Sequence, residues 1–260
     1  QQFGYGLSKL FPDFARNLFI KSVSRACDNQ LDAEVDLSPN YKPWDQRVCL
    51  VPDADLFEVI KSGKASVETD HIEKFDENGI QLKSGTHLDA DIVVSATGLD
   101  LVFLGNVDFQ VDGKQVIPNQ LLNYKGIMYS GMPNLAAVFG YTNASWTLKA
   151  DLTSEYVCRL LNEMDKAGVD YAVPEEGDTP LELEPWLDFS SGYVQRSLGK
   201  FPKQAVTKPW KLNQDYAKDL FALRFSKLDD GVLKFKTAAS KPKGVPVQEI
   251  TRSTNTVPAE

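Results

Sequence analysis

The segment between residues 135 and 168 constrains the fold more than any other part of the chain. It reads LAAVFGYTNASWTLKADLTSEYVCRLLNEMDKAG, in which an apolar run precedes a turn rich in small polar residues. Apolar residues then recur every three or four positions until Gly168, a pattern typical of an amphipathic helix that ends at glycine. A strand, a short turn and a helix in this order present the amino end of the helix to a ligand. The segment therefore predicts one unit of an α/β fold.

The residues of this turn add a chemical expectation. Asn143, Ser145 and Thr147 each carry a side chain that can cap the helix, and Ala144 and Trp146 lie between them. The free backbone N–H groups and the helix dipole favour an electron-rich ligand atom at this end. From these residues alone, an ordinary capped helix is the simpler interpretation.

A second apolar run, DIVVSATG at residues 91–98, predicts a buried strand that ends in small residues. Thr97 and Gly98 at its carboxyl end would let a backbone approach a cofactor closely. Upstream, residues 71–83 are typical of a β-hairpin around the turn sequence DENG. Residues 173–190 are rich in proline and glutamate and predict a surface loop.

The loop sequence YKPWDQR at residues 41–47 places an arginine close to a proline and a tryptophan. Arg47 has a planar, permanently charged guanidinium, which could stabilise an anion that develops near a cofactor. Pro43 and Trp44 would restrict the freedom of the loop. Taken alone, these residues fit better with a surface arginine on a structured loop.

Residues 8–31 predict an amphipathic helix with an apolar stripe and basic side chains around it. Such a helix can lie on a membrane or a partner, but we interpret it as a domain helix packed on its own core. The chain has 28 basic and 36 acidic residues, a net charge of −8. This charge argues against a broad nucleic-acid or anionic-membrane surface, although it allows a local basic pocket for a phosphate.

The cysteines and histidines show no metal or disulfide pattern. Three cysteines and two histidines are spread along the chain without CxxC spacing. Sparse cysteine favours a reducing compartment, and no apolar run reaches membrane-spanning length. We therefore expect no metal site, no transmembrane segment, no nucleic-acid partner and a cytoplasmic location, while the oligomeric state is not indicated.

Three runs, together and in this order, give the chain a family resemblance. They are YKPWDQRVCLVPDADLFEVIKSGKASVETDHIEKF, LDADIVVSATGL and YKGIMYSGMPNLAAVFGYTNASWTLKADLTSEYVCRLL. Over most of residues 10–225, the chain resembles the flavin-dependent monooxygenases of the Baeyer–Villiger type, in the group that includes the ethionamide-activating monooxygenase. The run YTNASWTLKADL is the most specific part of this resemblance, whereas many flavoproteins share the ATG run.

The resemblance implies an α/β flavoprotein with two dinucleotide-binding domains, one for FAD and one for NADPH. In such enzymes NADPH reduces the flavin, which captures O2 as a C4a-peroxide and oxygenates a ketone or a sulfur or nitrogen compound. The resemblance implies that Arg47 lies over the flavin and stabilises negative charge, with Trp44 and Gln46 as neighbouring cofactor contacts. Thr97 and Gly98 would lie at the junction between the domains. The cofactor contacts of the later turn would be Asn143, Ala144, Ser145, Trp146 and Thr147.

The chain also departs from the family pattern. It contains neither of the family's GxGxxG sequences, and it begins QQFGYG without a methionine. We therefore expect the C-terminal half of such an enzyme, which would be inactive and would bind FAD poorly by itself. Its expected parts are a helical segment at 1–40, the end of the NADPH domain at 41–90, the end of the FAD domain at 91–235 and a disordered tail at 236–260.

Two other functions stay open at this point. A flavoprotein reductase of the disulfide-reductase kind uses a similar ATG strand, although no CxxC pair is present in this sequence. A non-catalytic fragment or interaction module is the second alternative. If the chain is a monooxygenase, its small-molecule substrate is a ketone or a sulfur or nitrogen compound together with O2, and the sequence does not decide between these classes.

Overall fold

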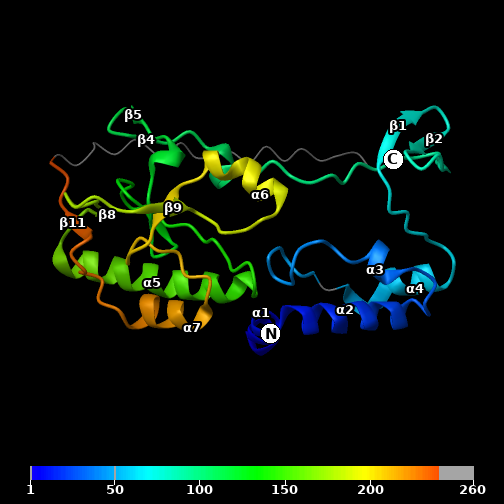
Figure 1. The fold of residues 1–260 in the computed structure, drawn as a ribbon. Coiled ribbons are helices and arrows are strands. Elements are labelled where there is room, and N and C mark those ends of the chain that lie inside the picture. The colour runs from blue at the N-terminus through cyan, green and yellow to red at the C-terminus, as the bar shows by residue number, and fades with distance from the viewer. Residues whose placement is uncertain (1, 50, 240–260) are drawn as a thin grey trace, which may run out of the picture.

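The computed structural model describes residues 2–49 and 51–239. Two regions are visible in Figure 1. The first region, through residue 89, contains four helices and a small sheet, and the second region, from residue 103 on, is built around the long helix α5 (Trp146–Ala167). An extended segment of residues 90–102 joins them. Most of the predicted tail, residues 240–260, lies outside the described residues.

The helix predicted over residues 8–31 is two helices, α1 (Gln2–Leu10) and α2 (Pro12–Ala26). They meet at Phe11, whose backbone angles are not helical. Pro12 is the first residue of α2, a position where its missing N–H group would have no helical partner in any case. The helices that contact α2 on its other sides are α3 (Ala33–Asp36) and α4 (Asp55–Lys61).

The apolar stripe of these helices faces solvent, which contradicts the expected packing on a core. Leu10 is 75% exposed, Phe14 is 61% exposed, and Ala15 is the single buried residue of α2. The neighbouring helices α3 and α4 are only four and seven residues long, so they are too short to cover the stripe. The amphipathic pattern therefore predicted helix correctly and burial incorrectly.

The hairpin predicted at residues 71–83 is confirmed. The strands form a three-stranded antiparallel sheet in the order β1–β2–β3. A Cβ atom at Gly79, the first residue of β2, would lie 2.0 Å from the carbonyl oxygen of Leu88, so this position requires glycine. The bounds of the strands are β1 (Ile72–Asp76), β2 (Gly79–Leu82) and β3 (His87–Asp89).

The run at residues 91–98 is not a buried strand in this structure. It pairs with no other strand of the described residues, and Ile92 and Val94 are each 82% exposed. A buried strand needs neighbouring strands that form backbone hydrogen bonds along both of its edges, and the described chain supplies no such neighbour here. The apolar run at 135–140 is not a strand either, although the Ala137 N–H group donates to the carbonyl oxygen of Ile127.

The second region buries its core against α5. This helix ends before Gly168, which has a left-handed φ of 65°, as the sequence predicted. Its buried side chains include Leu152 and Tyr156, which belong to a cluster with Trp210 and Leu233. The elements around it are β8 (Tyr171–Pro174), β11 (Leu233–Lys236), α7 (Tyr216–Asp219) and the π-helical η5 (Leu220–Phe225).

A second buried cluster contradicts the surface loop predicted at residues 173–190. Part of this segment is strand, and Trp186, Leu187 and Phe189 are buried. Mixed helical and strand content nevertheless agrees with the expected α/β class. The remaining elements are η1 (Pro52–Ala54), η2 (Phe103–Asn106), β4 (Gln110–Val111), β5 (Lys114–Gln115), η3 (Pro118–Gln120), β6 (Asn123–Tyr124), β7 (Met128–Tyr129), β9 (Leu183–Pro185), α6 (Gly192–Ser197), η4 (Leu198–Lys200) and β10 (Lys203–Ala205).

Candidate functional site

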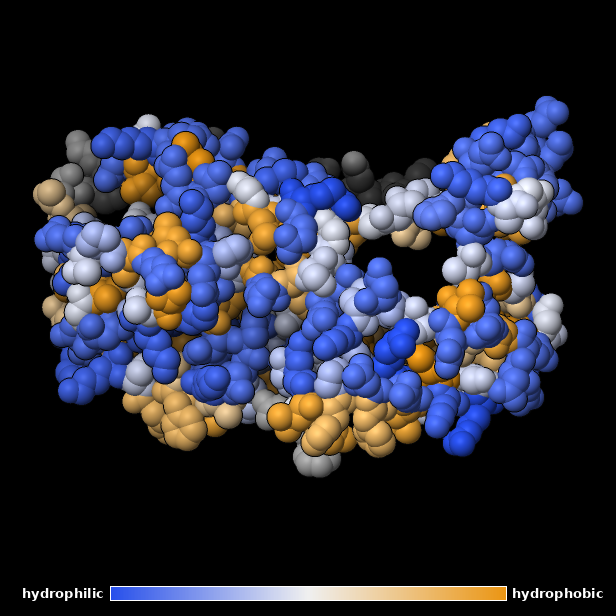
Figure 2. Space-filling view, in the orientation of Figure 1, coloured by the Kyte–Doolittle hydropathy of each residue, from blue (hydrophilic) through white to orange (hydrophobic). Residues whose placement is uncertain are grey.

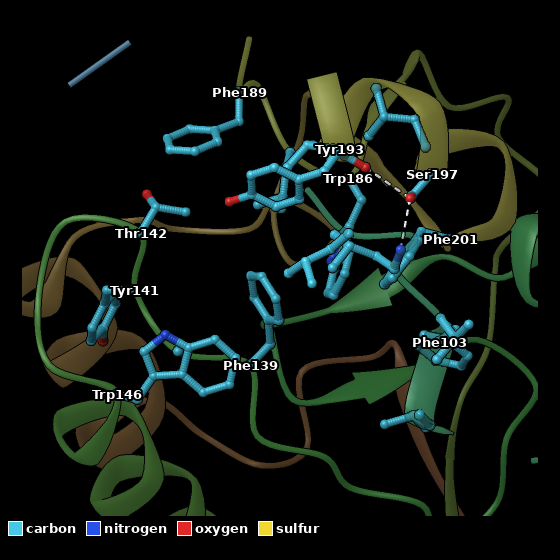
Figure 3. A pocket seen from close by; sticks show the side chains of 18 of the residues that line it. Phe103, Phe139, Tyr141, Thr142, Trp146, Trp186, Phe189, Tyr193, Ser197 and Phe201 are labelled. Atoms are coloured by element: carbon cyan, nitrogen blue, oxygen red, sulfur yellow. Dashed lines mark hydrogen bonds between the residues drawn. The ribbon is translucent and has the colours of Figure 1, made fainter. Parts of the chain in front are cut away.

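An aromatic cavity of about 410 Å³ lies between the start of α5, the η2 segment and α6. Figure 3 shows Phe189 and Tyr193 on the opposite side of the cavity from Trp146. Arg47 is the single charged side chain among the described residues that line it. The labelled lining residues are Phe103, Phe139, Tyr141, Thr142, Trp146, Trp186, Phe189, Tyr193, Ser197 and Phe201.

Aromatic contacts hold the wall of the cavity. The ring of Trp186 stacks on Phe201 with centroids 4.9 Å apart, and Phe139 lies 4.2 Å from Trp186 on another side. Phe139 also meets the Trp146 ring edge-on at 5.4 Å. A Cβ atom at Gly140 would lie 2.1 Å from the Trp146 side chain, so the close approach of the tryptophan requires glycine there.

The segment before η2 is attached to α6 by a serine. The Ser197 hydroxyl donates to the Tyr193 carbonyl oxygen at 2.8 Å and accepts the Leu101 N–H group at 3.0 Å (Figure 3). Leu99 lines the cavity, whereas Thr97 and Gly98 are exposed and do not line it. The two predicted cofactor contacts of the ATG run therefore lie next to the cavity wall and not in it.

The loop at residues 41–47 brings Arg47 to the mouth of the cavity. An Arg47 guanidinium nitrogen lies 3.5 Å from the Tyr141 carbonyl oxygen, across 94 positions of sequence. The loop is held by Asp45, whose carboxylate pairs with Lys9 at 3.0 Å and whose carbonyl oxygen accepts the Ser190 hydroxyl at 3.0 Å. The hydrogen bond from Lys9 lowers the pKa of Asp45. Arg47 itself remains exposed at the edge.

The other predicted residues of this loop have different neighbours. Trp44 adopts a left-handed φ of 70° and packs edge-on against Tyr5 with centroids 5.4 Å apart. Its side chain lines a neighbouring groove together with Asn143. Gln46 forms an isolated backbone bridge with Pro43. These contacts shape the loop, and Arg47 is the loop residue that reaches the aromatic cavity.

The turn before α5 does not cap the helix as predicted. Ser145 occupies the capping position, but its hydroxyl bonds the Thr147 hydroxyl at 2.7 Å and no backbone N–H group. The Asn143 amide instead donates to the Gln214 carbonyl oxygen at 3.1 Å, and the adjacent Ala144 is half-buried and does not line the aromatic cavity. The first N–H groups of α5 therefore have no side-chain cap, which favours an electron-rich ligand atom at this end.

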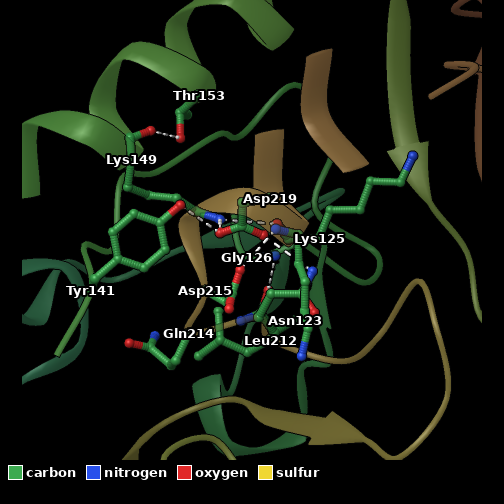
Figure 4. Close-up of polar contacts among 12 residues, drawn as sticks. Asn123, Lys125, Gly126, Tyr141, Lys149, Thr153, Leu212, Gln214, Asp215 and Asp219 are labelled. Carbon is green, nitrogen blue, oxygen red and sulfur yellow. Dashed lines mark hydrogen bonds and ion pairs between the residues drawn. The ribbon is translucent and has the colours of Figure 1, made fainter. Parts of the chain in front are cut away.

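Beneath this turn lies a buried ion pair that the sequence did not reveal. The Lys149 ammonium is 2.7 Å from the Asp219 carboxylate, and each side chain is 1% exposed. The same carboxylate accepts the Tyr141 hydroxyl at 2.8 Å and the Asn213 amide at 3.1 Å (Figure 4). Burial lowers the pKa of Lys149 against the opposing effect of Asp219, and burial raises the pKa of Tyr141. The pair attaches α5 to α7 directly behind the cavity.

The cavity suits a flat aromatic group better than a metal ion. Its walls are aromatic, and the buried indole N–H of Trp186 finds no acceptor among the described residues. An arginine at the mouth and an uncapped helix start both fit the electron-rich edge of a flat ring. Within the part of the chain that the structure describes, His, Cys, Asp and Glu side chains form no group of three that could hold a metal ion. Among the described helices, none combines the length and the apolar character that a membrane span needs.

Comparison with known proteins identifies the class to which this site is related. No family model matches the chain. Its relatives among curated proteins are FAD-binding or FAD-containing monooxygenases, with identities of 42–48% over about 90% of the chain. The chain is a homologue of these flavoprotein monooxygenases, which confirms the predicted resemblance to flavin-dependent monooxygenases. The Baeyer–Villiger type stays a prediction.

Three relatives illustrate the match. The chain is 48% identical to the probable FAD-binding monooxygenase AlmA of Acinetobacter baylyi, over 89% of the chain and 46% of the relative. It is 46% identical to the FAD-containing monooxygenase EthA of Mycobacterium tuberculosis, over 94% of the chain and 49% of the relative. It is 42% identical to the putative FAD-containing monooxygenase MymA of M. tuberculosis, over 90% of the chain and 48% of the relative. The chain thus spans about half the length of the curated relatives it matches.

Proposed function

We propose that this chain forms one side of the active site of an FAD-containing monooxygenase that uses NADPH and O2. The observation that carries the proposal is the position of Arg47 at the mouth of an aromatic cavity. The relatives support flavin-dependent monooxygenation over the disulfide-reductase alternative, because their names describe monooxygenases. Bound FAD, reduced by NADPH, would supply the activation of O2.

The chain's own residues would provide a positive charge and would exclude water from the reacting atoms. Arg47 would stabilise negative charge at the reacting oxygen, a contribution of about 3–4 kcal/mol for a preorganised donor in a low-dielectric site. The aromatic walls would exclude water and so strengthen this interaction. Trp146 and the uncapped N–H groups of α5 would hold the electron-rich edge of the flavin.

The remaining parts of the proposal concern cofactors and substrate. Trp146 would contact a cofactor in the cavity, and the cofactors would extend outside it to Trp44, Gln46, Thr97, Gly98, Asn143, Ala144, Ser145 and Thr147. The substrate would be a small ketone, converted to an ester, or a sulfur or nitrogen compound, which would be oxygenated at the heteroatom. The apolar lining of the cavity favours the uncharged members of these classes. The cytoplasmic location stays a prediction.

Replacing Arg47 tests the proposal. In the complete enzyme, Arg47→Ala should retain folding and flavin absorbance but abolish the oxygenated product, while NADPH oxidation continues and releases hydrogen peroxide. The matched control is Arg25→Ala, which removes an exposed arginine on α2. Product formation at a near wild-type rate in Arg47→Ala would contradict the assigned role.

The chain by itself supplies a separate test. We propose that its 260 residues bind FAD weakly or not at all, because neither GxGxxG sequence for a pyrophosphate is present in them. Flavin absorbance should therefore not copurify with the chain. Copurification of FAD at full occupancy would show that this part of the enzyme is sufficient for binding.

A further inference from the structure

Two separate elements expose large apolar side chains on the same face of the molecule. Figure 2 shows apolar side chains along the lower edge, beneath α1, α2 and α7. In the η5 segment that follows α7, Phe221 is 66% exposed and its ring lies 5.8 Å from that of Phe225. We call this surface the apolar face, and its members are Leu10, Phe11, Phe14, Leu18, Phe221 and Phe225.

Basic residues accompany both halves of the apolar face. Residues 2–26 contain four basic residues and one acidic residue, and residues 208–230 contain five basic and four acidic residues. One of those acidic residues, Asp219, is buried in its ion pair with Lys149. The whole chain has the opposite balance, with a net charge of −8. Basic residues therefore outnumber acidic residues in both segments that carry the exposed aromatic rings, although the chain as a whole is acidic.

A lysine-lined groove lies directly beside Phe221. Its lining includes Phe221 itself, Asp229 and Asp230, and five lysines: Lys125, Lys208, Lys211, Lys218 and Lys227. Two of the lysines have acidic partners, since Lys125 pairs with Asp230 and Lys211 with Glu184. Lys208, Lys218 and Lys227 are exposed, and they form no ion pair within residues 2–49 and 51–239. Three ammonium groups therefore stay available to an anion next to an exposed aromatic pair.

We propose that the apolar face docks on the surface of an anionic phospholipid membrane. Exposed Phe and Leu side chains enter the boundary between headgroups and acyl chains, while lysines beside them attract anionic headgroups. The aromatic rings project from two elements that are far apart in sequence, with polar residues between them. A lipid surface accommodates such separated groups because it needs no complementary shape, whereas a protein partner would have to match each of them.

The apolar face lies away from the unpaired segment of residues 91–98. Among the described residues, the backbone of this segment has no strand partner, and it runs on the side of the molecule away from α1 and α2 (Figure 1). Strands that complete its pairing would therefore cover a different side. The proposal also does not depend on the reaction, since the face lies outside the aromatic cavity.

Cosedimentation with lipid vesicles tests the proposal on the complete enzyme. The wild-type protein should bind vesicles that contain phosphatidylglycerol, should bind pure phosphatidylcholine vesicles much less, and should dissociate at high salt. Phe14→Glu and Phe221→Glu should each weaken binding about tenfold or more, because each removes one inserted ring. Lys218→Glu combined with Lys227→Glu should weaken binding to the anionic vesicles in particular. The matched control is Phe75→Glu on β1, where an equally exposed phenylalanine lies away from the face.

Three outcomes would overturn the proposal. The first is no binding to the phosphatidylglycerol vesicles, and the second is an equal loss of binding in Phe75→Glu. The third is a wild-type dimer without vesicles that Phe14→Glu and Phe221→Glu convert to monomer in sedimentation velocity, which would assign the face to a second copy of the chain. All the substituted residues are exposed, so circular dichroism should show unchanged folding.

Discussion

The region around α5 buries large side chains and an ion pair, whereas the region from α1 to β3 buries few apolar side chains and no aromatic one among its described residues. Around α5, Tyr124, Tyr156 and Trp210 are almost completely buried. In the first region, the buried apolar residues of the described chain are Ala15, Cys27, Ala33, Ile60 and Leu82. Both regions contain amphipathic patterns of similar quality. Periodicity therefore specifies an element, but burial requires enough neighbouring elements to cover its apolar side.

The number of surrounding elements explains the difference. The 22-residue α5 is covered by α7, η5 and the strands β8 and β11, which come from later parts of the chain. The 15-residue α2 has only short helices beside it. Because stability in globular proteins comes mainly from tertiary packing, the first region should be the less stable one.

Amide hydrogen exchange on this chain should show the largest contrast between the two regions. Amides of α5 around Leu152 and Tyr156 should be protected by about a thousandfold or more, since they open only with the core. Amides of residues 91–98 should exchange at nearly the rate of an unfolded peptide, because no strand within residues 2–49 and 51–239 pairs with them. Strong protection of residues 91–98 would break the comparison, since it would require pairing that the structure does not contain.

Replacing Lys149 should produce the next largest effect. Lys149→Met leaves the Asp219 carboxylate buried without its cation, which should lower the free energy of unfolding by about 3–5 kcal/mol in urea denaturation. The control is Glu155→Gln, which breaks the exposed pair with Arg224 and should change the free energy of unfolding far less, because solvent screens this pair. Equal effects in the two variants would show that burial does not distinguish the pairs.

The smallest expected effect concerns a surface pair of the first region. The hydrogen bond to Asp76 raises the pKa of His87 above its ordinary value of 6.5, and the same bond lowers the pKa of Asp76 below 3.8. The stabilisation from His87 is complete below pH 6.5 and is lost as the pH rises through the raised pKa. The stabilisation from Asp76 is present above pH 3.8 and is lost as the pH falls through the lowered pKa.

An NMR titration of the His87 ring measures this coupling. In Asp76→Asn the pKa of His87 should fall toward its ordinary value, although Asp89 at 2.9 Å retains part of the shift. Asp100→Asn removes a carboxylate from another exposed pair, with Lys200, and should leave the titration of His87 unchanged. An unchanged pKa in Asp76→Asn would show that the hydrogen bond contributes nothing in solution.

The candidate site was predictable only in part. The sequence pointed to Arg47 and Trp146, and the structure places both at the same cavity, although their roles stay predictions. The structure places Trp44 and Asn143 in a neighbouring groove, and it leaves Thr97 and Gly98 outside the cavity wall. The missed lining residues include Trp186, Phe189, Tyr193 and Phe201, of which the first two belong to the run WLDF. This aromatic run was the available signal, but the surrounding proline and glutamate obscured it.

The sequence by itself determined the features that depend on residues close together in the chain. The β-hairpin, the helix α5 and its end at Gly168 depend on turn residues and periodicity within a few positions, so they were predictable. The tertiary structure alone decided the pairing of Lys149 with Asp219, the contact of Arg47 with residue 141, and the exposure of α2. These features join residues far apart in the chain, or depend on which elements cover a surface. No local pattern contains that information, because burial and ion pairing follow from how the whole chain packs.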